Sequence, residues 1–209
     1  FQTFYNLVDT WFAGRISAEA IAAIAKSFPI YFIIIAIGVG LTAGTNTLIG
    51  NNIGANNKKK ASLFVAQSII FAIFLSILIT FFGLGVSDFL LSIMGSDQEG
   101  IILSRKYLDI IFYGTIIVLI QISLNGTLNA QGDTKSYRNV LIFSFFLNIF
   151  LNPLFIFGYG FIPAFGIAGL AIATVVSQFI GLLYLAHKVY CCELKPVSYT
   201  HLRAHETLN

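Results

Sequence analysis

Long apolar runs alternate with short polar segments along the whole chain. Each long run approaches the 20 or so residues that an α-helix needs to cross a ~30 Å hydrocarbon core. We expect a first helix ending near Gly14 and further helices over residues 18–49, 61–84, 102–130, 137–157 and 167–190. The intervening segments 50–60, 95–100, 131–135 and 158–166 contain Gly, Asn, Asp, Lys or Pro and are predicted to be loops or turns. The pattern indicates an all-α, polytopic membrane protein built as a six-helix bundle.

The two ends of the chain differ from this pattern. The first apolar stretch is too short to span a bilayer and soon meets Asp9, so we expect the first helix to be truncated. Residues 1–196 are predicted to form one transmembrane domain. Residues 197–209 are polar, and we expect them to be a non-native tail left by sequence assembly. His201 and His205 have the spacing of a helical metal pair, but no partner ligands accompany them, so we predict no metal site there.

Composition supports the membrane assignment and excludes other classes. Hydrophobic residues make up 57% of the chain, charged residues 10%, and mean hydropathy is +0.85, whereas soluble domains average about 25% charged residues. A net charge of +3 without a basic, aromatic-interleaved patch argues against nucleic acid as a partner. Lys and Arg favour the loops at 50–60 and 131–135 and the end of the last helix, which places these in the cytoplasm. We therefore expect a multi-pass protein of the cytoplasmic membrane.

Two amides sit inside the fifth predicted helix. Asn148 and Asn152 are one turn apart and share a face, and Pro153 frees the carbonyl group of Ile149 from its usual partner. That face must point toward protein or water rather than lipid. Taken alone, the pair fits interhelical hydrogen bonding, worth ~0.6 kcal/mol on average, as well as it fits a functional site.

Other predicted helices carry similar polar stripes. Residues four apart, or close to that spacing, repeat on four further helices: Tyr5, Asn6 and Asp9; Thr42 and Asn46; Gln121, Asn125 and Asn129; and Thr174 and Gln178. Because several helices carry such stripes, we expect the polar side chains to line a shared, water-containing interior.

Asp9 is the strongest candidate for function. A carboxylate within a transmembrane segment costs ~2.5–3.5 kcal/mol on insertion scales and marks a functional site by default. Apolar surroundings favour the neutral acid and a bound cation favours the carboxylate, so such a group can exchange a proton for a cation. Asn and Thr oxygens with one carboxylate suit a hard monovalent cation such as Na⁺. The alternative is that Asp9 is simply hydrated near the outer end of its helix.

The glycines and Asp133 have mainly structural interpretations. Gly40 and Gly44, and Gly50 and Gly54, are small-xxx-small pairs that we expect to permit close helix approach. Asp133 lies in a Gly-containing turn and is predicted to stabilise that turn rather than to bind a ligand.

An ordered set of motifs resembles the multidrug and toxic compound extrusion (MATE) family. The motifs are NLVDTWFAG (6–14), GNNIGANN (50–57), LNAQGDTK (128–135), NIFLNPLFIFG (148–158) and GIAGLAIAT (166–174). The resemblance implies the N-terminal lobe of a twelve-helix transporter built from two six-helix lobes. Such proteins export organic cations, drugs or other amphipathic small molecules by alternating access, in exchange for Na⁺ or H⁺. The implied partners are a drug-like substrate, membrane lipid and the C-terminal lobe of the same chain, with no cofactor beyond the coupling ion.

The resemblance also implies a cation or proton site in this lobe. The family positions that match are Asp9, Asn125, Asn148, Asn152 and Thr174, with Tyr5 nearby. The position of Asn152 often holds aspartate in the family. This departure leaves Asp9 as the sole carboxylate of the interior, so either Asp9 handles the ion alone or coupling lies in the second lobe.

Three other functions compete with drug export. A lipid-linked precursor flippase of the same superfamily would have a more cationic cavity, and no Lys or Arg falls in the middle of a predicted span. A membrane scaffold would not need converging polar stripes. An intramembrane enzyme is disfavoured because neither HExxH nor GxSxG occurs.

Overall fold

The computed structural model describes residues 2–192 and 194, with side chains described from residue 6 onward. Within this range the chain forms six helices: α1 (Gln2–Ile16), α2 (Ala18–Gly54), α3 (Lys58–Ile93), α4 (Gln98–Ala130), α5 (Lys135–Phe157) and α6 (Ile167–Cys191). Helices α2 to α6 are each long and apolar enough to cross a membrane. The predicted all-α, six-helix architecture is confirmed. The predicted tail, 197–209, lies outside the described residues.

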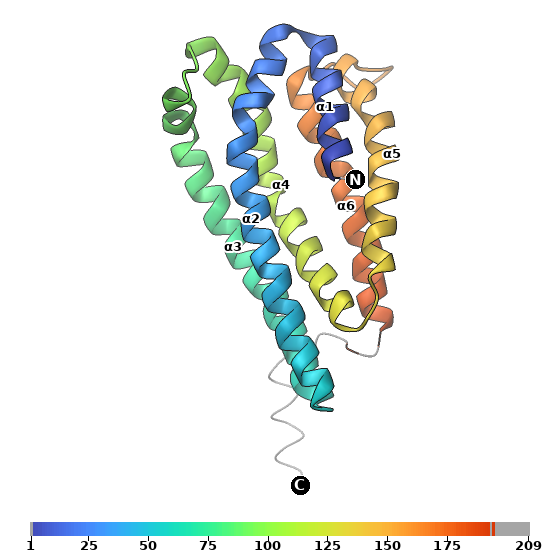
Figure 1. The fold of residues 1–209 in the computed structure, drawn as a ribbon. Helices are drawn as coiled ribbons and strands as arrows, with labels where there is room; N and C mark the ends of the chain where they lie inside the picture. Colours follow the sequence, from blue (N-terminus) through green and yellow to red (C-terminus); the bar gives the residue numbers. More distant parts are fainter. Residues whose placement is uncertain (1, 193, 195–209) are drawn as a thin grey trace.

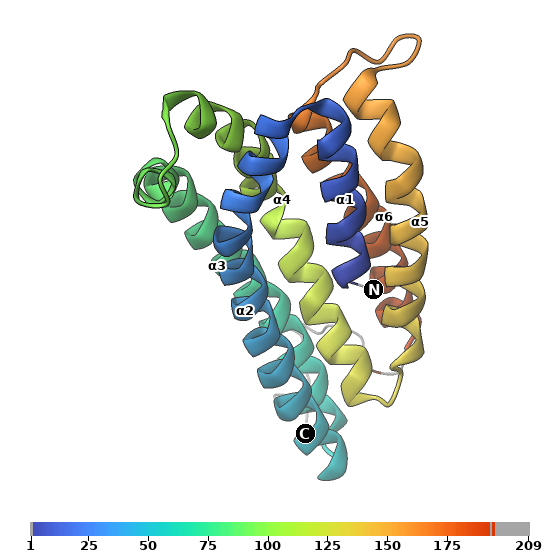
Figure 2. The same ribbon diagram turned by 45° about the horizontal axis from the view of Figure 1, so that its top comes forward.

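The helices are arranged around α4. Helix α4 packs against α2, α3 and α6, while α5 packs against α6, and α1 contacts α2, α5 and α6. Figure 1 shows the long α2–α3 pair on one side of α4 and α5 with α6 on the other. Figure 2 shows α1 lying beside α5 and α6. This placement brings α1, which carries Asp9, against the helix that carries the two predicted amides.

Some predicted loop boundaries are wrong. Residues 50–54 continue α2 and residues 58–60 begin α3, so only a short turn remains of the loop expected at 50–60. The turn uses Asn56, which adopts a positive φ of 56°, and Asn57, whose side chain accepts a hydrogen bond from the Lys60 amide at 3.1 Å. Asn is one of the few residues suited to both tasks, turning the chain and capping a helix. Helix α3 also runs past the expected end at 84, and α4 starts at Gln98, four residues early.

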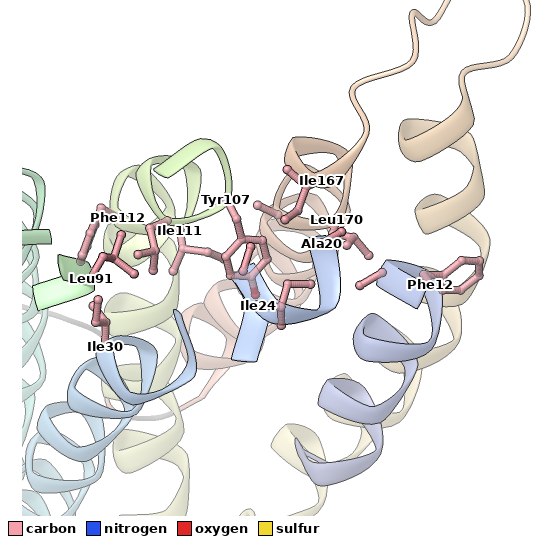
Figure 3. Close-up of a cluster of buried hydrophobic side chains, with 14 of the residues drawn as sticks. Phe12, Ala20, Ile24, Ile30, Leu91, Tyr107, Ile111, Phe112, Ile167 and Leu170 are labelled. Carbon is pink, nitrogen blue, oxygen red and sulfur yellow. The ribbon is translucent and has the colours of Figure 1, made fainter. Parts of the chain in front are cut away.

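Apolar side chains join all six described helices at the end of the bundle near the α1–α2 turn. Figure 3 shows members of this cluster from α1 (Phe12), α2 (Ala20, Ile24, Ile30), α3 (Leu91), α4 (Tyr107, Ile111, Phe112) and α6 (Ile167, Leu170). These side chains are 0–9% exposed. Phe12 joins α1 to this cluster three residues after Asp9.

The glycine prediction was wrong. A Cβ atom added at Gly40, Gly44, Gly50 or Gly54 would meet nothing within 4 Å, so these glycines do not form helix contacts in the described part of the chain. Close approach occurs at other glycines instead. A Cβ at Gly126 of α4 would lie 3.0 Å from the Thr42 carbonyl oxygen of α2, and one at Gly169 of α6 would collide with the Phe155 carbonyl of α5. Gly169 therefore allows α6 to pack directly on the backbone of α5.

Candidate functional site

Asp9 lies in a buried cluster between three helices. Its side chain points from α1 toward α5 and α6 and is 5% exposed. The Oδ1 atom accepts a hydrogen bond from Asn152 Nδ2 at 3.0 Å, and Oδ2 accepts one from Thr174 Oγ1 at 3.2 Å. Hydrogen bonds to the charged form are the main way a buried carboxylate is stabilised without a counter-ion. Two helices thus supply the donors that the carboxylate of a third requires.

The same cluster includes Asn148. Asn152 Nδ2 also donates to Asn148 Oδ1 at 2.9 Å, and Asn148 Nδ2 donates to Thr174 Oγ1 at 3.4 Å. The four side chains form a closed ring of hydrogen bonds, which we call the Asp9 cluster. The amide of Asn152 has one orientation in this ring, because a flipped amide would place its oxygen against two other oxygens.

Local sequence explains how these residues meet. The i, i+4 spacing places Asn148 and Asn152 on one face of α5, and both are buried, at 1% and 0% exposure. Gly169 permits the tight α5–α6 contact a little more than one turn before Thr174 on α6. The predicted meeting of Asp9 with residues of two other helices therefore has a direct packing basis.

One oxygen of the cluster has no partner within the protein. Asn152 Oδ1 is buried and accepts no hydrogen bond from any described residue. The Asp9 carboxylate, Asn148 Oδ1 and Thr174 Oγ1, which lie on the Nδ2 side of this amide, make a set of hard oxygen ligands. Such a set fits a small cation. A proton on Asp9 would be accommodated by the same acceptors.

The fifth family position, Asn125, is not hydrogen-bonded to the Asp9 cluster in the described part of the chain. Asn125 is buried in α4 at 8% exposure, and its Oδ1 atom has no partner among the described residues. The structure therefore joins four of the five predicted coupling residues directly.

The residues predicted to line a cavity have different surroundings. Gln121 and Gln178 are buried, Asn6 and Thr42 are partly buried, and Asn46 is exposed. Thr42 Oγ1 donates to the Ile122 carbonyl of α4 at 3.3 Å, which is an interhelical contact. A groove of about 780 Å³ between α2 and α3 is lined by Thr45 rather than by Thr42 or Asn46. The side chain of Tyr5 lies outside the described residues.

The sequence interpretation missed two buried serines. Ser144 of α5 donates from Oγ to the Ser177 carbonyl of α6 at 3.2 Å, and both serines are at most 1% exposed. The spacing offered a signal, since Ser144 lies four residues before Asn148 and extends the stripe of Asn148 and Asn152 by one turn.

Comparison with known proteins now identifies the family. The family model described as MatE matches residues 1–154. The chain belongs to the MATE family. It is similar to the FAD transporter of Shewanella oneidensis, with 31% identity over 178 residues that cover 85% of this chain and 39% of the relative. It is also similar to the probable multidrug resistance protein NorM of Thermotoga maritima, with 31% identity over 192 residues, 90% of this chain and 41% of the relative.

Solved MATE structures share the fold. A crystal structure of MATE in the bent conformation superposes with a TM-score of 0.87 at 30% identity, covering 95% of this chain and 44% of that chain. The chain spans about two fifths of the length of the curated relatives it matches. The predicted match to one lobe of a MATE transporter is confirmed, and the family is one of membrane transporters rather than enzymes.

Proposed function

We propose that this chain is the N-terminal lobe of a cation-coupled antiporter that exports amphipathic small molecules by alternating access. The coupling ion is Na⁺ or H⁺, and the Asp9 cluster is where it binds. The transporter works in the cytoplasmic membrane, and a C-terminal lobe of the same chain completes the substrate path. Five apolar helices and membership of a transporter family support this placement.

One observation carries the proposal. A carboxylate, two amides and a hydroxyl from α1, α5 and α6 meet in one buried ring, with an unpaired oxygen on Asn152. A purely structural hydrogen-bond network has no need of a carboxylate, whose burial is expensive unless it binds a proton or a cation. The ring therefore has the composition of an ion-exchange site.

The ring also links ion binding to helix position. Asp9 is the residue of α1 that the ring holds, and α1 contacts α2, α5 and α6. An ion that replaces the hydrogen bonds to Asp9 changes how firmly α1 is tied to α5 and α6. If the ion binds one arrangement of α1 more tightly than a second arrangement, it shifts the equilibrium of the lobe toward the first. The change in free energy between the two arrangements cannot exceed the difference in the ion's binding free energy.

The substrate class follows from the relatives. One relative is named a FAD transporter and another a probable multidrug resistance protein. Amphipathic small molecules, including organic cations and other drugs, are the class that covers both names. A lipid-linked precursor flippase is not favoured by these relatives.

The test is ion-driven efflux by the full-length transporter reconstituted in vesicles. Asp9→Asn keeps the size of the side chain and one acceptor oxygen but removes its ability to ionise, so we expect efflux driven by a Na⁺ or H⁺ gradient to be abolished or strongly reduced. Asp88→Asn is the matched control, because Asp88 is exposed on α3 and pairs with Arg105 at 3.0 Å, away from the cluster. Wild-type efflux in Asp9→Asn would remove Asp9 from the mechanism.

A further inference from the structure

Gln121 of α4 is a buried amide whose polar atoms have no partner. Its side chain is 2% exposed, and neither Nε2 nor Oε1 forms a hydrogen bond with any residue that the structure describes. An unpaired buried donor or acceptor costs about 1–3 kcal/mol. Native proteins rarely leave such groups unsatisfied, and those that have no protein partner commonly bind an ordered water or ion.

The surroundings of Gln121 bring a second polar group close. A Cβ atom added at Gly181 of α6 would lie 3.2 Å from Gln121 Nε2 and 3.2 Å from Ser144 Oγ. The amide of α4 and the hydroxyl of α5 therefore lie against the same glycine of α6. Position 181 has no room for a larger residue, since an added Cβ would lie 2.6 Å from Val140 Cγ1, so glycine is what lets α6 come this close to both polar groups.

The chemistry of the unpaired atoms selects the ligand. Nε2 is a donor and Oε1 is an acceptor. A cation would satisfy only the oxygen, and an anion only the N–H groups, whereas water both donates and accepts. We propose that Gln121, together with Ser144, binds an internal water where α4, α5 and α6 meet.

The position of this water gives it a role in the proposed transport cycle. Ser144 lies eight residues from Asn152, or about 12 Å along α5, and nine residues from the start of the helix at Lys135, or about 14 Å. The site is thus about one turn from Asn148, the nearest member of the Asp9 cluster, and lies midway between Asn152 and the end of α5 that the Lys and Arg distribution places in the cytoplasm. Asn125, one turn from Gln121 on α4, offers a further unpaired oxygen.

Proton transfer proceeds over hydrogen-bond distances of about 2.6–3.2 Å or through one intervening water. The path of about 26 Å from Asn152 along α5 to its start at Lys135 therefore needs intermediate groups. The water held by Gln121 is one of these intermediates, and we call it the relay water. Its relay role rests on the proposed function of Asp9, whereas the water site itself does not.

The first test is structural and does not depend on transport. In a map of the full-length transporter fine enough to resolve ordered water, we expect density within hydrogen-bond distance of the Gln121 amide. The density should be lost in Gln121→Met, which keeps an unbranched side chain of similar length. Absence of density in the wild type, or density that strengthens with Rb⁺ or Tl⁺ and so marks a cation, would overturn the proposal.

The direction of the change in Tm on thermal unfolding is an independent test of the bound water. If the Gln121 amide were dry, replacing it with an apolar side chain would remove an unpaired polar group and raise Tm. If instead the amide binds a water, Gln121→Met removes a hydrogen-bond partner of that water, so we expect a lower Tm. We expect a smaller decrease in Tm for Ser144→Ala. Gln67→Met, at an exposed amide of α3, serves as the control and is expected to leave Tm unchanged. A higher Tm in Gln121→Met would contradict a bound water.

The relay role has its own readout. We expect Gln121→Met to slow proton-driven efflux several-fold while leaving substrate affinity unchanged, because no substrate contact is removed. Water density with unchanged efflux would exclude the relay role. Loss of function in Asp9→Asn together with unchanged efflux in Gln121→Met would leave the proposed function standing and exclude only the relay.

Discussion

The two sides of α4 are stabilised by different interactions. On one side, α1, α5 and α6 pack closely, and their buried polar side chains bond to each other in the Asp9 cluster. On the other side, α3 is largely exposed: 11% of its most apolar segment is buried, against 50% in α6. Large apolar side chains cover the exposed surface of α3, among them Phe71, Phe74, Phe81, Phe82 and Phe89.

This difference reflects which side chains are stable against lipid and which must be buried against protein. Exposed aromatic and aliphatic side chains suit a hydrocarbon environment, so the surface of α3 needs no protein partner to be stable in a membrane. The amides and the carboxylate of the other side do need partners, and they find them across helix interfaces. The polar side is therefore the side on which single substitutions are expected to matter most.

The largest expected effect concerns matched glycines on the two sides. Gly169→Ala forces a methyl group against the Phe155 carbonyl of α5, whereas Gly44→Ala adds one facing the open groove of α2 and α3. We expect Gly169→Ala to destabilise the full-length protein by about 3 kcal/mol, at the upper end of overpacking costs. Gly44→Ala should change stability by less than about 0.5 kcal/mol. Denaturant unfolding in detergent measures both, and equal effects would contradict the packing described for the two sides.

The next comparison concerns two asparagines. Asn152→Ala removes the donor shared by Asp9 and Asn148 and leaves two buried oxygens unpaired, so we expect a loss of about 2 kcal/mol. Asn46 is exposed on α2, and Asn46→Ala should be nearly neutral. Thermal unfolding of Asn152→Ala and Asn46→Ala measures the two losses of stability. A neutral Asn152→Ala would show that the ring of hydrogen bonds contributes nothing to folding.

A smaller effect is expected for two threonines. Thr174→Val removes one donor to Asp9, and we expect a loss of about 1 kcal/mol together with a weaker dependence of efflux on the coupling ion. Thr42→Val removes a single interhelical bond to the Ile122 carbonyl, worth about 0.6 kcal/mol, and leaves ion dependence unchanged. Ion titrations of efflux distinguish the two variants. Unchanged ion dependence in Thr174→Val would place the hydroxyl outside the coupling site.

The smallest effect lies outside the apolar spans, in the turn between α4 and α5. Asp133 accepts hydrogen bonds from the Ser136 hydroxyl and amide and from the Lys135 amide, and these bonds, with Ser136 contributing most, hold the pKa of the Asp133 carboxyl below its usual value of 3.8. Asp133→Ala should cost about 0.5 kcal/mol. Thr134→Ala is the control, because Thr134 makes no capping bond with its side chain.

The pH dependence of this contribution has a defined sign. Because the folded-state pKa of Asp133 is lowered, its stabilisation is fully present above the ordinary carboxyl pKa and is lost as pH falls through the lower folded-state value. Unfolding measured between neutral and acidic pH should show the difference between wild type and Asp133→Ala shrinking in acid. A difference that grows in acid would be inconsistent with the capping bonds.

The sequence predicted the helices well because apolar length is a local property. It predicted the loop at 50–60 poorly because Asn and Lys are also compatible with helix ends, and the capping by Asn57 decides where α3 begins. It misassigned the glycines because spacing does not reveal which way a helix is rotated. Gly169 and Gly126 face neighbouring backbones, while Gly40 and Gly44 face a groove.

Part of the candidate site could be predicted from the sequence. Spacing alone places Asn148 and Asn152 on one face and Thr174 in a polar stripe, the cost of a carboxylate in a span singles out Asp9, and the family resemblance assigns all four to one site. The unpaired atoms of Gln121 and their closeness to Ser144 depend on three helices meeting at Gly181, which no local pattern in one helix encodes.

The central claim is that the carboxyl group of Asp9 responds to the coupling ion. Infrared difference spectroscopy on the full-length transporter tests this directly, because it detects the protonation of a buried carboxyl while Na⁺ concentration or pH is varied. We predict an ion-dependent carboxyl band that disappears in Asp9→Asn and persists in Asp88→Asn. The same ion-dependent band in Asp9→Asn, or no ion-dependent band in the wild type, would contradict the claim.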